Sequence, residues 1–176
     1  MRDRFETERL LLRPLEQRDA AAIHRHCQDG SIARFTAHIP APYPVLAVEL
    51  YILSVRAGAG NRNRFAYAVT GKDDDRLVGA CGIFKRNAAA THWEIGYWVG
   101  PEAQGRGIAS EAAAGLVEAA RADLAPDRLV AGHFEDNPAS GRVLEKLGFA
   151  YTGETTRLFS MGRMAYATSR DMALAV

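Results

Sequence analysis

The residues best suited to chemistry in this sequence form a short segment with two glycines, Gln104-Gly105-Arg106-Gly107-Ile108-Ala109. A strand-like run precedes it and an apolar-periodic stretch follows, so the segment predicts a turn from a strand into a helix. Glycine lets the main chain approach a ligand closely and turn its N–H groups toward it. The start of a helix adds unpaired N–H groups and a partial positive charge, which favour phosphate. Ala109 and Ser110 are small enough to leave room for a diphosphate, and Arg106 adds positive charge at the rim.

Two other phosphate-binding motifs fit this segment poorly. A P-loop ends in Gly-Lys-Ser or Gly-Lys-Thr, and the segment contains no lysine. The dinucleotide fingerprint requires a third Gly or Ala, where this chain has Ser110, and it requires an early βαβ unit. A tight strand-to-helix turn that binds no ligand stays open as the alternative.

Glu94 is the best candidate for a catalytic base. It lies in the apolar run Trp93-Glu94-Ile95-Gly96-Tyr97, where partial burial would raise the pKa of its carboxyl and suit it to accept a proton. The alternative is a carboxylate paired with an arginine in a purely structural role. His133 lies in a later strand-like run and is a candidate for the acceptor side, although a lone histidine in a strand is more often structural.

No metal site is predicted. His24 and Cys27 share one face of a predicted helix while His26 points elsewhere, and no fourth ligand is near. The three aspartates at 73–75 lie in a polar turn, which predicts a solvated hairpin tip.

The elements that must position these residues alternate between strands and helices. Asp19 is predicted to cap the first helix, and Gly148 is predicted to end the last one. Strands are expected at 10–12, 65–70, 77–84, 91–99, 129–134, 149–152 and 169–174, and helices at 20–28, 45–57, 108–122 and 138–147. This order predicts an α/β fold with a mixed sheet.

Composition limits the class of protein. The 176 residues, 48% apolar and 24% charged, suit one globular domain spanning 1–176. With 22 basic and 21 acidic residues the net charge is +1, which does not favour a nucleic-acid partner. The two cysteines form no disulfide framework, and the sequence shows neither a signal peptide nor a long apolar run. A cytoplasmic protein without a membrane partner is expected.

The sequence resembles the GCN5-related N-acetyltransferase (GNAT) superfamily. The coenzyme A loop of that superfamily reads Gln/Arg-x-x-Gly-x-Gly/Ala, which Gln104, Gly107 and Ala109 match. The likeness covers nearly the whole chain and extends to the RimJ/RimL-like branch, which acetylates the N-termini of ribosomal proteins. Four segments carry it: Thr7–Pro14, Ile39–Tyr43, Glu94–Val99 and Asn137–Phe149.

The resemblance implies a GNAT fold, with a mostly antiparallel sheet splayed between its fourth and fifth strands and flanked by about four helices. The pantetheine arm of acetyl-CoA would lie in the gap, and a main-chain N–H there would bond the thioester oxygen. The implied coenzyme-binding residues are Tyr97, Trp98, Val99, Gln104, Gly105, Arg106, Gly107, Ile108, Ala109, Ser110, Asn137 and Ser140. Asn137 precedes a proline, so it is also an ordinary helix cap.

The implied activity is acetyl transfer from acetyl-CoA to a primary amine by direct attack in a ternary complex. The acceptor is a protein N-terminal α-amine or a small-molecule amine. An α-amine is neutral in about one of seven molecules at pH 7 and a lysine amine in about one of 2,500, so only the lysine reaction demands a strong base. Family members often carry a tyrosine where this chain has Leu144, so Ser140 is the candidate to bond the sulfur. A catalytically idle acyl-CoA-binding domain is the alternative, and both a monomer and a homodimer stay open.

Overall fold

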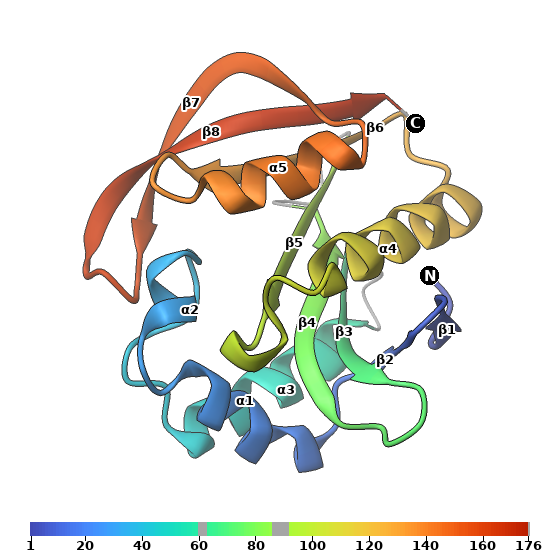
Figure 1. Ribbon diagram of the computed structural model, residues 1–176, viewed down its shortest axis with the longest axis vertical. Coiled ribbons are helices and arrows are strands. Elements are labelled where there is room, and N and C mark those ends of the chain that lie inside the picture. Colours follow the sequence, from blue (N-terminus) through green and yellow to red (C-terminus); the bar gives the residue numbers. More distant parts are fainter. Residues whose placement is uncertain (60–62, 86–91, 176) are drawn as a thin grey trace.

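The computed structural model describes residues 1–59, 63–85 and 92–175. One sheet contains eight strands in the order β1-β2-β3-β4-β5-β6-β8-β7 (Figure 1). The strands are β1 (Phe5–Glu6), β2 (Leu10–Pro14), β3 (Arg64–Gly71), β4 (Leu77–Phe84), β5 (Trp93–Val99), β6 (Arg128–Phe134), β7 (Ala150–Ser160) and β8 (Ala165–Ala175). The α-helices of the described residues are α1 (Ala20–Cys27), α2 (Ser31–Arg34), α3 (Val45–Ala59), α4 (Ile108–Leu124) and α5 (Pro138–Lys146). None of these helices is long and apolar enough to span a membrane.

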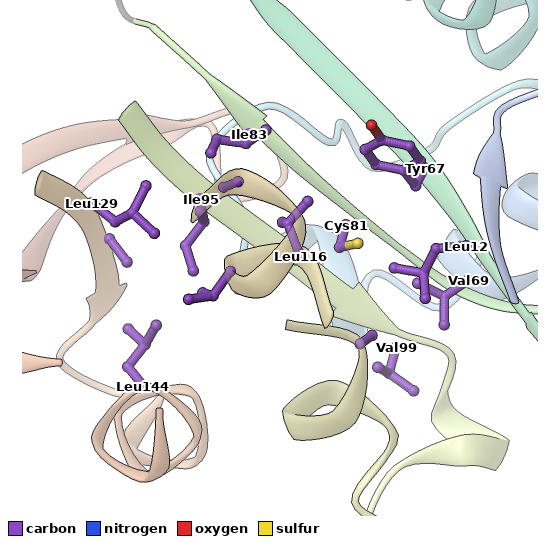
Figure 2. Packing of buried hydrophobic residues seen from close by; sticks show 14 of the residues in the cluster. Leu12, Tyr67, Val69, Cys81, Ile83, Ile95, Val99, Leu116, Leu129 and Leu144 are labelled. Atoms are coloured by element: carbon purple, nitrogen blue, oxygen red, sulfur yellow. The ribbon is translucent and has the colours of Figure 1, made fainter. Parts of the chain in front are cut away.

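Two apolar clusters cover opposite faces of the sheet. Tyr67 and Val69 of β3 belong to the cluster under α4 and α5, whereas Ala68 between them belongs to the cluster under α1 and α3. Successive strand residues point to opposite faces, so the two helix layers sandwich the sheet. Figure 2 shows Leu116 of α4 in the middle of the first cluster, with Leu12 to one side and Leu129 to the other.

The sheet is splayed where the resemblance to the GNAT superfamily implied a splay. β5 and β6 run parallel and pair only through Trp93 with Leu129 and Glu94 with Val130. β5 continues its pairing with β4 as far as Val99, while β6 continues with β8 as far as Phe134. The two strands therefore diverge beyond Glu94. They correspond to the predicted fourth and fifth strands, because the short β1, which was not predicted, shifts the numbering by one. The predicted α/β fold with a mostly antiparallel sheet is confirmed.

The last two strands are much longer than predicted. The predicted strands at 149–152 and 169–174 are the base of a hairpin whose strands each span 11 residues. Most of β7 is exposed, so its sequence lacks the alternating apolar pattern that reveals a half-buried strand. The two-residue strand β1 and the four-residue helix α2 were also missed.

The predicted capping role of Asp19 was wrong. Its side chain makes no cap hydrogen bond to α1; it is buried and accepts two hydrogen bonds from Arg13, at 2.8 and 2.9 Å. A buried arginine needs a paired carboxylate, and this demand outweighs the capping preference. The aspartate turn also differs from a purely solvated tip, because Asp75 accepts hydrogen bonds from Arg13 and Arg18. By contrast, Gly148 ends α5 with a φ of 88°, as predicted.

Candidate active site

The glycine-rich segment forms an exposed turn at the start of α4. Gly105 and Gly107 have φ angles of 72° and 78°, in the left-handed region that glycine tolerates best. Gly107 is the N-cap, and no side chain caps the helix there. The N–H groups of the first helical turn therefore have no partner within the helix. A Cβ built on Gly105 meets no atom within 4 Å, so the turn faces open space of the kind that a diphosphate requires.

Gln104 connects this turn to the splay. Its side-chain amide donates a hydrogen bond of 3.0 Å to the main-chain oxygen of Val99, the last residue of β5. The side chain of Ile108 is buried in the core, so only its main chain is placed to contact a ligand. The predicted loop at residues 104–110 thus lies next to the open end of β5.

Arg9, Thr7 and Glu111 also belong to the turn, and sequence reasoning missed them. Glu111, in the first turn of α4, accepts hydrogen bonds from the Thr7 hydroxyl (2.5 Å), the Arg9 main chain (2.7 Å) and Arg9 Nε (2.6 Å). Arg9 Nη1 also donates to the main-chain oxygen of Arg106 at 3.2 Å. No local pattern signals contacts between residues about a hundred positions apart, although an Arg just before β2 and a Glu in the first turn of α4 are visible in the sequence.

Tyr97 and Ser140 meet across the splay. The Tyr97 hydroxyl lies 3.1 Å from Ser140 Oγ and donates to the Ser140 main-chain oxygen at 3.1 Å. Burial raises the pKa of Tyr97 to about 12, against the opposing effect of the hydrogen bond with Ser140, so the phenol stays protonated at neutral pH. Asn137 accepts a hydrogen bond from the Ser140 N–H at 3.3 Å, which makes it the N-cap of α5. The predicted residues from β5 and α5 are therefore brought together, and the Tyr97 side chain takes part through its hydroxyl.

Glu94 lies on the opposite face of β5 from Tyr97, because the two are three residues apart in the strand. It is half-buried and lines a cavity of about 190 Å³ together with residues of β6, β7 and β8. Gly96, on the same face, is exposed, and a Cβ built on it meets no atom within 4 Å. The strand thus presents a carboxylate and an open stretch on one face and a phenol on the other.

His133 fits a structural role. The His133 side chain is buried. Its Nδ1 donates a hydrogen bond to Phe134 O at 2.9 Å, because a carbonyl oxygen can only accept, and its Nε2 is hydrogen-bonded to the Tyr151 hydroxyl at 3.0 Å. A Cβ on Gly141 would lie 2.7 Å from both His133 Nε2 and the Tyr151 hydroxyl, so glycine allows α5 to pack onto this pair. Leu144, at the position of the family's tyrosine, is buried in the core.

The histidines and cysteine of α1 are engaged separately. His24 Nδ1 bonds Tyr43 O at 2.7 Å, and His26 Nε2 bonds Leu77 O at 3.1 Å. Burial raises the pKa of the Cys27 thiol to about 12. Over residues 1–59, 63–85 and 92–175, no three His, Cys, Asp or Glu side chains are arranged to hold a metal ion.

Comparison with known proteins identifies the family. A family model described as an acetyltransferase (GNAT) domain matches residues 9–150. The uncharacterized N-acetyltransferase YnaD of Bacillus subtilis (strain 168) is 29% identical over 147 residues, which cover 84% of this chain and 82% of YnaD. The uncharacterized N-acetyltransferase YoaA of the same organism is 27% identical over 165 residues, 94% of this chain and 93% of YoaA.

Solved structures share the fold. A GNAT-family acetyltransferase from Bacillus anthracis matches with a TM-score of 0.83 at 22% identity, covering 98% of each chain. Mycobacterium smegmatis RimJ, solved in complex with CoA-disulfide, matches with a TM-score of 0.82 at 24% identity, covering 95% of this chain and 82% of RimJ. The family model, the curated relatives and the splayed sheet agree: this chain belongs to the GNAT family and is an acetyltransferase.

Proposed function

We propose that this acetyltransferase transfers the acetyl group of acetyl-CoA to a primary amine, either a protein N-terminal α-amine or a small-molecule amine, by direct attack in a ternary complex. The observation that carries the proposal is the open turn at residues 104–107, where two left-handed glycines expose the start of a 17-residue helix. Main-chain N–H groups and the helix dipole favour a diphosphate at such a turn. Gln104 to Ser110 hold it.

The splay accommodates the pantetheine arm. Beyond Glu94, β5 has no ladder with β6, so the edge of Tyr97, Trp98 and Val99 is open to an extended ligand that pairs with it as a strand would. Asn137 and Ser140 border the gap from α5. The acetyl group then lies near Tyr97 and Ser140, and a main-chain N–H of β5 stabilises the charge that develops on the thioester oxygen.

The two faces of β5 serve different steps. The amine approaches from the face of Glu94 and Gly96, and its nitrogen forms a bond to the thioester carbon while the C–S bond breaks. Before the attack, the Glu94 carboxylate takes a proton from the ammonium form of the amine, directly or through water. The proton that the nitrogen loses on forming the amide passes through water to the departing thiolate. On the other face, Ser140 Oγ donates a hydrogen bond to the departing sulfur, while Tyr97 keeps its bond to the Ser140 main chain.

A covalent acetyl-cysteine intermediate has no support in this geometry. Both cysteines are buried. Burial raises the pKa of Cys27 to about 12 and that of Cys81 further still, so neither thiol provides the thiolate that such a step needs.

The acceptor is tested by the release of free coenzyme thiol. The protein is incubated with acetyl-CoA and peptides that carry a free N-terminus, with the same peptides N-terminally blocked but bearing one lysine, and with small amines. Release with the free N-termini supports an α-amine acceptor, and release with small amines alone identifies a small-molecule enzyme. Calorimetric binding of acetyl-CoA without thiol release in the presence of any acceptor would favour the idle acyl-CoA-binding domain. The observation behind that alternative is Leu144, which is buried where family members often carry a tyrosine.

A further inference from the structure

Arg9 lies over the turn that the proposed function assigns to the diphosphate. Its guanidinium bonds Glu111 through Nε and the Arg106 main-chain oxygen through Nη1. A Cβ built on Gly107 would lie 3.5 Å from Arg9 Nη2, so this third nitrogen reaches the edge of the open turn. The Arg9 side chain is half exposed, at 49%.

Glu111 places a negative charge beside this turn. Burial works to raise the pKa of its carboxyl, but hydrogen bonds from Thr7 and from the main chain and side chain of Arg9 outweigh burial and lower that pKa. The carboxylate is therefore ionised at neutral pH. A carboxylate in the first turn stabilises the helix, yet it repels a diphosphate bound at the same end unless a cation lies between them.

We propose that Arg9 is a binding residue for the coenzyme diphosphate: it neutralises Glu111, fixes the main chain at Arg106, and presents Nη2 to the phosphate. This inference rests on the proposed function, because it requires the diphosphate at residues 104–110. Arg9 immediately precedes β2, so it lies outside the glycine-rich motif and nearly a hundred positions away from it in the sequence.

The chain offers a matched control at the other end of the same helix. Arg2 and Asp123 also pair the N-terminal segment with α4, with side chains 47% and 17% exposed, against 49% and 16% for Arg9 and Glu111. Asp123 lies 12 residues after Glu111, or about 18 Å along the helix axis. Arg2→Ala therefore removes a comparable ion pair without touching the turn.

The test measures the dissociation constant of coenzyme A by calorimetry for the wild type, Arg9→Ala, Arg9→Ala with Glu111→Gln, and Arg2→Ala. Arg9→Ala is expected to weaken binding by about tenfold or more, and adding Glu111→Gln is expected to recover part of that loss, because the unneutralised charge is gone. Arg2→Ala is expected to stay within about twofold of the wild type. Acetylpantetheine, which lacks the diphosphate, should show the same KM with Arg9→Ala as with the wild type.

Each result decides between these ideas. Equal affinities for Arg9→Ala and Arg2→Ala, no recovery in the double variant, or an equal loss with acetylpantetheine would overturn the inference while leaving the proposed function standing. A wild-type protein that does not bind coenzyme A would overturn the proposed function and this inference with it. Should Arg9→Ala fail to fold, Arg9→Lys replaces it: lysine retains the charge but not the fork that reaches both Glu111 and Arg106, so a smaller loss is expected.

Discussion

At the scale of single residues, Gly107 has a left-handed backbone conformation and lies beside the space proposed for the diphosphate. Gly107→Val is expected to weaken acetyl-CoA binding by more than about tenfold, because its side chain occupies the space that the diphosphate needs. The left-handed φ of 78° adds about 1–2 kcal/mol of strain. Calorimetry with acetyl-CoA measures the affinity, and thermal unfolding measures the strain.

Gly153 separates these two effects. Its φ is 87°, and a Cβ built on it meets no atom within 4 Å, so Gly153→Val imposes similar strain in β7, away from the turn. The control is expected to lower stability and to leave acetyl-CoA affinity unchanged. A loss of affinity as large as that of Gly107→Val would show that the effect of Gly107 is on folding alone.

Glu94 is tested through the pH dependence of turnover. Glu94→Gln is expected to lower kcat/KM by about a hundredfold below the pKa of the acceptor amine, near 7.8 for an α-amine, and by much less above pH 9. Above its pKa the amine is already neutral, so it needs no base to take its proton. Glu154→Gln, on the rim of the same cavity, is the control. A uniform loss at every pH would assign Glu94 a structural role.

At the scale of the elements, Arg13 connects β2 to α1 and to the turn between β3 and β4. The hydrogen bond from Arg13 lowers the pKa of Asp75 below its ordinary value. A carboxyl whose pKa is lower in the folded state adds stability above its unfolded pKa of about 3.9, and that stability is lost as the pH falls through the folded pKa. Asp75→Asn is therefore expected to destabilise the protein at pH 7 and to differ less from the wild type near pH 3.

Urea unfolding at both pH values measures this difference. Asp73→Asn, in the same turn but exposed, is expected to change the free energy of unfolding by less than about 0.5 kcal/mol at either pH. A constant destabilisation by Asp75→Asn from pH 7 to pH 3 would show that its effect is independent of ionisation.

The elements also show what sequence can predict. β4, for example, was placed at its observed bounds, because the polar turn at residues 71–76 separates it from the preceding strand and marks the two as a hairpin. The turn at residues 104–107 was recognised because glycine has a specific backbone use there. Pairing between side chains far apart in the sequence leaves no local pattern, so the contacts of Arg13 with Asp75, Arg9 with Glu111 and Tyr97 with Ser140 required the structure.

At the scale of the whole molecule, the N-terminal and C-terminal halves are joined at both ends of the splay. At the narrow end β5 and β6 share two residue pairs. At the open end, the turn between β7 and β8 reaches α2 (Figure 1). There the Met161 N–H donates to Ala37 O at 3.0 Å, and Arg163 Nε donates to Arg34 O at 2.7 Å. The hairpin therefore joins the C-terminal half of the sheet to the helical layer of the N-terminal half.

Gly162 makes this second junction possible, because a Cβ there would lie 2.5 Å from the main-chain carbonyl of Ala33. Gly162→Ala is expected to separate the hairpin tip from α2 and to speed amide hydrogen exchange at Met161 and in the residues after α2. Ala33 is buried but belongs to neither of the two apolar clusters on the sheet, so the melting temperature should fall by only about 3–6 °C. The two half-sheets flank the splay, so the KM for the acceptor should rise several-fold. Acetyl-CoA affinity, which we propose depends mainly on the turn at α4, should change little. Unchanged exchange at Met161 would mean that the hairpin tip does not depend on its contact with α2. A loss of acetyl-CoA affinity as large as the rise in the acceptor KM would mean that this junction supports coenzyme binding rather than acceptor binding.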